Sequence, residues 1–115
     1  MKIDELDKLD DLSAQFIMGW KPSALGYDWL DERTERVMGK DAWNPTANIA
    51  QAWECLEKIG FENYFAKEIV RCHENENGWT VVLMRKNDDL NIIERAATPS
   101  LAIVKACLSA RGVEI

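Results

Sequence analysis

The chain has 115 residues, of which 47% are hydrophobic and 30% charged, and its formal net charge at pH 7 is -6. This length and composition are typical of a globular protein, and we expect residues 1–115 to form a single domain. The negative charge argues against direct binding of nucleic acid, because neutralising phosphates requires clustered Lys and Arg. A protein partner with a basic surface is the more natural expectation.

The first predicted element is an amphipathic helix. Apolar residues recur at helical spacing from Ile3 to Trp20, and acidic residues fill much of the remaining surface. We expect this helix to end near Gly19. The acidic face is typical of a solvated surface, and it could also contact a basic protein. The candidate contacts on this helix are Asp4, Asp7 and Asp11.

Residues 21–46 show no sustained period, but they are rich in aromatic residues and contain a charged run from Asp31 to Arg36. We expect them to fold over the core, with one helical turn or a short strand around residues 27–36. Their acidic residues would extend the protein-binding surface, and the candidates are Asp31, Glu32 and Glu35.

The same segment offers a second candidate site, because aromatic rings with nearby arginines can stack on bases or clamp an anion. The residues proposed for such a ligand are Trp20, Trp29, Arg33, Arg36 and Trp43. The alternative interpretation, which we favour, is that the rings belong to the core and the arginines pair with neighbouring acids.

The stretch WNPTANIAQAW, residues 43–53, predicts the start of a second helix. Pro45 disfavours helix at the residue before it, and Thr46 and Asn48 can cap a helix. Apolar residues then recur at helical spacing up to a stop at Gly60. The expected buried face consists of Ile49, Ala52, Trp53, Leu56 and Ile59.

Three strands and a final helix follow. Apolar runs at residues 61–73, 79–85 and 90–96 are separated by Asn, Asp and Gly clusters, which predicts an antiparallel meander. Both faces of the middle strand are apolar, so we expect helices on both sides. Thr98 and Pro99 predict the start of the last helix. The fold class is therefore α+β, with a three-stranded antiparallel sheet, room for one extra short strand, and the order α, irregular segment, α, β, β, β, α.

The sequence predicts no metal site and no cofactor. His73 is the only histidine, and no second Cys or His lies at ligand spacing from it or from Cys72. We interpret Cys55, Cys72 and Cys107 as reduced, buried thiols. Neither a signal-like N-terminus nor an apolar run of about 20 residues is present, so we expect a bacterial cytoplasmic protein with no membrane contact.

Three stretches together resemble the phage ABA sandwich domain family of small phage and prophage proteins. They are MGWK at residues 18–21, WNPTANIAQAW at 43–53 with its following helix, and AATPSLAIVKACLSA at 96–110. The resemblance implies a single α/β/α sandwich-like domain and a phage or prophage origin. It implies no catalytic residues, because the family is one of unknown function.

The leading hypothesis is a non-enzymatic phage accessory protein that binds a host or phage protein, for example to inhibit an antiviral defence component. It rests on the acidic balance, the missing catalytic constellation and the resemblance. Two alternatives remain open. One is a small-molecule or nucleotide binder that uses the Trp and Arg segment, and the other is a structural subunit that self-associates into a homo-oligomer.

Overall fold

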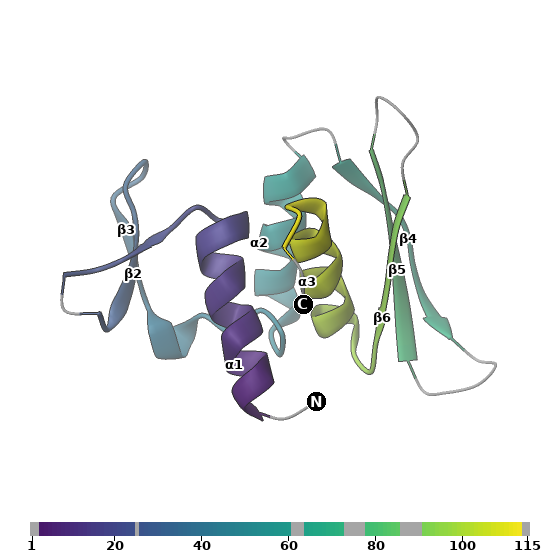
Figure 1. Ribbon diagram of the computed structural model, residues 1–115, viewed down its shortest axis with the longest axis horizontal. Helices are drawn as coiled ribbons and strands as arrows, with labels where there is room; N and C mark the ends of the chain where they lie inside the picture. The colour runs from purple at the N-terminus through teal and green to yellow at the C-terminus, as the bar shows by residue number, and fades with distance from the viewer. Residues whose placement is uncertain (1–2, 25, 61–63, 73–77, 86–90, 114–115) are drawn as a thin grey trace.

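A computed structural model describes residues 3–24, 26–60, 64–72, 78–85 and 91–113, with backbone alone for 3–4, 64–72 and 85. Between the two ends of the molecule lie, in order, a small sheet, the first helix, a pair of helices and a large sheet (Figure 1). The elements are α1 (Ile3–Leu12), the π-helical turn η1 (Ser13–Ile17), β1 (Lys21–Pro22), β2 (Asp28–Asp31), β3 (Arg36–Gly39), the 3₁₀ turn η2 (Lys40–Ala42), α2 (Ile49–Gly60), β4 (Tyr64–Cys72), β5 (Gly78–Arg85), β6 (Asn91–Ala96) and α3 (Pro99–Ala110).

The large sheet is the predicted antiparallel meander. Its strand order is β4-β5-β6, so the α+β class and the three-stranded sheet are confirmed. Burial alternates along β5, where Val81 and Leu83 are fully buried while Val82 and Met84 are only partly covered.

The described helices cover one face of this sheet, whereas we expected helices on both. On the opposite face Val82 lies beside Ile93, whose side chain is 64% exposed. The reason is the position of α3, whose side chains are buried nearly all round because it packs between the large sheet and the η1 turn. Residues 21–46, which we expected to fold over the core, do not cover the outer face of this sheet. They lie instead on the side of α1 that is away from the large sheet.

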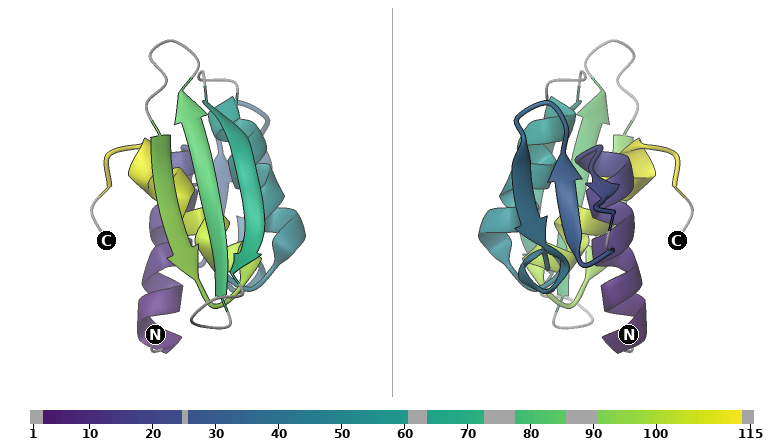
Figure 2. Two further views of the ribbon diagram at one scale, coloured as in Figure 1. Left: turned by 90° about the vertical axis from the view of Figure 1, so that its right-hand side faces the viewer. Right: turned by 90° about the vertical axis from the view of Figure 1, so that its left-hand side faces the viewer.

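That segment, residues 21–46, forms a second sheet rather than one extra strand. β1 pairs with β2, and β2 pairs with β3, all antiparallel. Trp29 and Met38 are partners in the register, and both contact the main core. The small sheet therefore closes the end of the molecule opposite the large one (Figure 2).

Helix boundaries follow the predicted caps. The side chain of Asn48 accepts a hydrogen bond from the backbone N–H of Gln51, and Thr98 does the same for Leu101. The first helix continues into the wider π-helical turn η1 and ends where Gly19 adopts a φ of 73°, close to the expected stop. Among the described residues, no helix is long and apolar enough to span a bilayer.

The buried face of α2 differs from the prediction at its N-terminal half. Ala52, Leu56 and Ile59 are buried as expected, but Ile49 and Trp53 are 46% and 47% exposed. Cys55 is fully buried instead, on the side of α2 that packs on α3. Trp53 therefore does not anchor the core, whereas Trp43, at the other end of the stretch, does.

Candidate functional site: an acidic groove beside the first helix

A buried hydrogen-bond network joins α1 to the segment that precedes α2. The backbone N–H of Thr46 donates to Oδ1 of Asp10 over 2.9 Å, and Trp43 Nε1 donates to Ser13 Oγ over 3.0 Å. The Ser13 hydroxyl donates in turn to the backbone oxygen of Asp10. All four residues are buried. These contacts fix the distance between α1 and residues 43–46.

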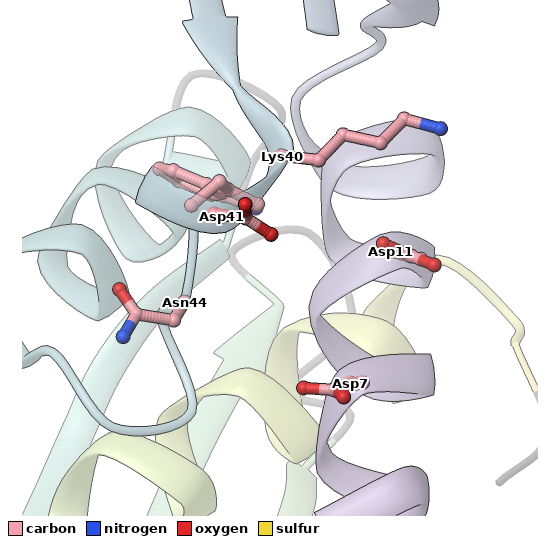
Figure 3. A pocket seen from close by; sticks show the side chains of 6 residues that line it. Asp7, Asp11, Lys40, Asp41 and Asn44 are labelled. Atoms are coloured by element: carbon pink, nitrogen blue, oxygen red, sulfur yellow. The ribbon is translucent and has the colours of Figure 1, made fainter. Parts of the chain in front are cut away.

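Between these two elements lies a cavity of about 380 Å³, which we call the acidic groove. Figure 3 shows Asp7 and Asp11, one helical turn apart on α1, facing the segment that carries Asp41 and Asn44. The lining residues are Asp7, Asp11, Lys40, Asp41, Trp43 and Asn44. Two residues predicted for protein binding, Asp7 and Asp11, are thus brought together with a carboxylate 30 residues away in sequence.

The charge of the groove is set by its three carboxylates and by Lys40. The Lys40 ammonium lies 4.6 Å from the centroid of the Trp29 ring, and its side chain extends away from Asp41 in Figure 3. A cation–π contact of this kind holds the ammonium against the ring. The carboxylates therefore remain available to accept hydrogen bonds from a cation, and charge-assisted bonds of this type are stronger than neutral ones.

Asp10 lies behind the groove and is 6% exposed. Burial raises the pKa of this carboxyl, since an ionised group loses hydration there. Hydrogen bonds from Thr46 lower the pKa in part, and the negative charges of Asp7 and Asp11 raise it further. The groove and the network behind it are thus electrostatically coupled.

Within the part of the chain that the structure describes, no group of three or more His, Cys, Asp or Glu side chains is placed to hold a metal ion. The three carboxylates of the groove line two walls, with Asp7 and Asp11 on α1 and Asp41 on η2. This arrangement suits the cationic side chain of a Lys or Arg, which can donate several hydrogen bonds.

The other acidic candidates lie elsewhere. In the small sheet Asp28 pairs with Gly39 at the end next to the groove, and Asp31 pairs with Arg36 at the opposite end. Three strand steps, roughly 10 Å, separate the two ends. Glu32 and Glu35 lie in the turn beyond Asp31, so they do not extend the groove. Asp4 belongs to α1, but its side chain lies outside the described residues.

Asp31 has a structural role in that turn. Its carboxylate accepts hydrogen bonds from the backbone N–H of Arg33 and from the Thr34 hydroxyl. Although burial acts to raise it, the pKa of Asp31 is lowered by the hydrogen bonds from Thr34 and Arg33. This Asx-type arrangement orders the hairpin, and Lys21 pairs with Glu32 across its exposed surface.

Glu35 offers a direct test of this turn, because its φ of 58° lies in the left-handed region. Glycine adopts that region without the steric cost that an L side chain meets. We expect Glu35→Gly to raise the free energy of unfolding by about 0.5–1 kcal/mol, measured by urea denaturation. Glu32→Gly, in the same turn, is the control and is expected to lower stability. A loss of stability in Glu35→Gly would contradict the turn geometry.

The aromatic residues proposed for ligand binding are brought together, but as core. Trp20, Trp29 and Trp43 are between 1% and 4% exposed, and the Trp20 and Trp43 rings meet edge to face at 4.6 Å. Arg36 lies over Trp20 at 5.7 Å and pairs with Glu54, whereas Arg33 is exposed in the hairpin turn. This arrangement favours the packing interpretation, since buried rings offer no face to a stacking ligand.

The cysteines show no reactive environment among the described residues. Cys55 and Cys107 are free and fully buried, as expected. Burial raises the pKa of both thiols, so neither is present as a nucleophilic thiolate near neutral pH. His73 and the side chain of Cys72 lie outside the described residues.

Sequence reasoning missed three lining residues of the groove, namely Lys40, Asp41 and Asn44. Lys40 and Asp41 follow β3 directly and carry no periodic or motif signal, and Asn44 belongs to the WNPTANIAQAW stretch, which predicted a helix start and not a site. The contacts of Thr46 with Asp10 and of Trp43 with Ser13 place them opposite α1. A tertiary contact of this kind is not visible in local spacing.

Comparisons with known proteins agree with this architecture. Residues 11–108 match the phage ABA sandwich domain family. The crystal structure of a phage protein from Bacillus cereus ATCC 14579 is similar over 100% of this chain and 92% of that one, with a TM-score of 0.73 and 19% identity. No curated protein matches the sequence. Because the family match spans most of its length, the chain belongs to the phage ABA sandwich domain family.

Proposed function

We propose that this phage protein is a non-enzymatic accessory protein that binds a host or phage protein carrying a basic surface. The observation that supports this most is the acidic groove, in which Asp7, Asp11 and Asp41 face one cavity. A Lys or Arg side chain of the partner would enter the groove and donate hydrogen bonds to the carboxylates. Inhibition of an antiviral defence protein in the bacterial cytoplasm is one role that such binding would serve.

The net charge of -6 supports the same proposal. A surplus of carboxylates attracts basic surfaces over several ångströms, which raises the association rate more than it raises affinity. Binding through the groove is therefore expected to weaken as ionic strength rises, because salt screens exposed charges.

The test is capture of partners from nuclease-treated lysates of infected and uninfected bacteria, with wild type and the triple variant Asp7→Asn, Asp11→Asn, Asp41→Asn. We expect the variant not to capture a partner that wild type captures, or to bind that partner with a Kd about tenfold higher or more. A tenfold change corresponds to ~1.5 kcal/mol, the coupling energy of one close charge pair. The asparagines preserve side-chain size, so the change reports charge.

A matched control removes the same number of charges away from the groove, with Glu5→Gln, Glu32→Gln and Glu35→Gln. These residues are exposed on α1 and in the hairpin turn of the small sheet. If the control variant loses the partner to the same extent, overall charge and not the groove carries the binding. If neither variant changes the captured partner, the proposal is wrong.

A further inference from the structure

The outer part of α2 carries apolar surface that the core does not use. Ile49 and Trp53 are about half exposed and lie one turn apart, and Ala50 and Glu57 complete the exposed stripe. A half-exposed Trp is common at protein interfaces, where such residues often dominate the binding energy. The stripe is separate from the acidic groove.

The orientation of α2 shows which neighbour this stripe borders. Gln51 donates to the backbone oxygen of Ala42 and accepts from Asn44, and Glu54 pairs with Arg36, so this flank faces the small sheet. Ile49 and Trp53 lie on the opposite flank of the helix at 3.6 residues per turn. That flank borders the large sheet, whose strand β4 contacts α2.

β4 is an edge strand of the large sheet. Among the described strands it pairs with β5 alone. Seen from the large-sheet side, α2 lies behind β4 and extends past its outer edge (Figure 2, left). The helical layer is thus wider than the sheet that covers it. The register of β4 shifts between Ala66 and Glu68, which leaves Glu68–Cys72 as its longest regular stretch.

We propose that β4 accepts an added strand from a partner protein. The extended segment would pair with the backbone of Glu68–Cys72 and lay apolar side chains on Ile49 and Trp53. An unpaired strand edge offers its N–H and C=O groups to such a segment, and the side chains beneath it supply specificity. The added strand would extend the sheet over the uncovered part of α2.

Charge identifies the chemistry of the partner. Glu57 is exposed and continues the stripe one turn beyond Trp53, so a basic side chain on the added segment would face a carboxylate. A second copy of this chain is disfavoured, because two molecules of net charge -6 repel each other. The expected occupant is therefore an extended segment that alternates apolar and basic residues.

The proposal is tested with short synthetic peptides of alternating valine and lysine. The peptides are added to the Asp7→Asn, Asp11→Asn, Asp41→Asn variant, so that their lysines do not bind the acidic groove. The result is therefore independent of whether the groove proposal is correct. We expect binding with a change in Trp53 fluorescence, absent in Trp53→Phe, and slower hydrogen exchange of the β4 amides. A valine–glutamate peptide is expected to bind about tenfold more weakly.

Two controls separate strand addition from apolar adhesion. Trp53→Ala is expected to raise the Kd about tenfold, whereas Val37→Ala, at an exposed apolar site on the small sheet, is expected to leave it unchanged. A peptide that is N-methylated at every amide keeps its side chains but has no N–H to donate to β4, so it is expected not to bind. Equal binding of that peptide, no effect of Trp53→Ala, or no peptide binding would overturn the proposal. If the protein forms a dimer in the absence of peptide and Trp53→Ala dissociates that dimer, the segment that pairs with β4 comes from a second copy of this chain and not from a partner protein.

Discussion

Trp43→Ala is expected to lower the free energy of unfolding by about 3–5 kcal/mol, the range for removing a large buried aromatic side chain. Trp43 is 2% exposed, meets the Trp20 ring at 4.6 Å, and donates to Ser13 Oγ. The substitution leaves a cavity and removes the partner of a buried hydroxyl. Because the total stability of a small domain is about 5–15 kcal/mol, this is a large part of it. Urea denaturation measures the loss.

Trp53→Ala is the matched control, since it makes the same chemical change ten residues away on a half-exposed side chain. It is expected to cost about 1 kcal/mol or less. Trp43→Phe separates packing from hydrogen bonding, because it keeps an aromatic ring and loses the indole N–H; we expect an intermediate loss. Equal losses for Trp43→Ala and Trp53→Ala would contradict the core described above.

The large sheet and the helix starts were predictable because their signals are local. β5 alternates between buried and partly covered residues, and side chains that cap helices precede α2 and α3 in sequence. Each of these features follows from residues within a few positions of one another. Their boundaries in the structure differ from the predicted ones by a few residues at most.

The small sheet was not predictable in the same way. Its strands have two to four residues, too few to show a period of two. The layering was also hidden, because α3 is apolar over a wide arc that fits a helix on either side of a sheet. Trp53 shows a further limit, since periodicity marks apolar positions but does not reveal which end of an apolar arc reaches solvent.

The groove was predicted in part. Asp7 and Asp11 follow from helical spacing, because residues four apart share a face. Their partner Asp41 comes from a segment without a pattern, and the other predicted protein-binding residues Asp31, Glu32 and Glu35 lie outside the groove. The reason is the hairpin of the small sheet: its turn lies away from α1, whereas η2, at its other end, lies next to α1.

Asp10→Ala is the second substitution with a large expected effect. The carboxylate accepts the buried N–H of Thr46 over 2.9 Å, and alanine would leave that donor without an acceptor. Loss of such a bond to a charged group is expected to cost about 2–3 kcal/mol. The same change would release residues 43–46 from α1 and open the groove, so binding through Asp7 and Asp11 would weaken as well.

Asp10→Asn separates the hydrogen bond from the charge. Its amide oxygen can still accept from Thr46, but the desolvated negative charge beside Asp7 and Asp11 is gone. At pH 7 we expect Asp10→Asn to unfold with a free energy equal to or above that of wild type. Urea denaturation of all three proteins at one pH checks the order, which is Asn, wild type, then Ala.

The pH dependence of that difference follows from the raised pKa of Asp10. In the pH range between its usual value of 3.8 and the raised folded value, the folded state binds more protons than the unfolded state, so acidification through this range stabilises wild type. The free-energy cost of burying the charge of Asp10 is fully present above the pKa of Asp10 in the folded state and is lost below 3.8. The advantage of Asp10→Asn over wild type is therefore expected to shrink as pH falls from 7 toward 4. An advantage that grows on acidification would mean that the folded protein lowers the pKa of Asp10, and the carboxylate would then be a net stabilising charge held by Thr46.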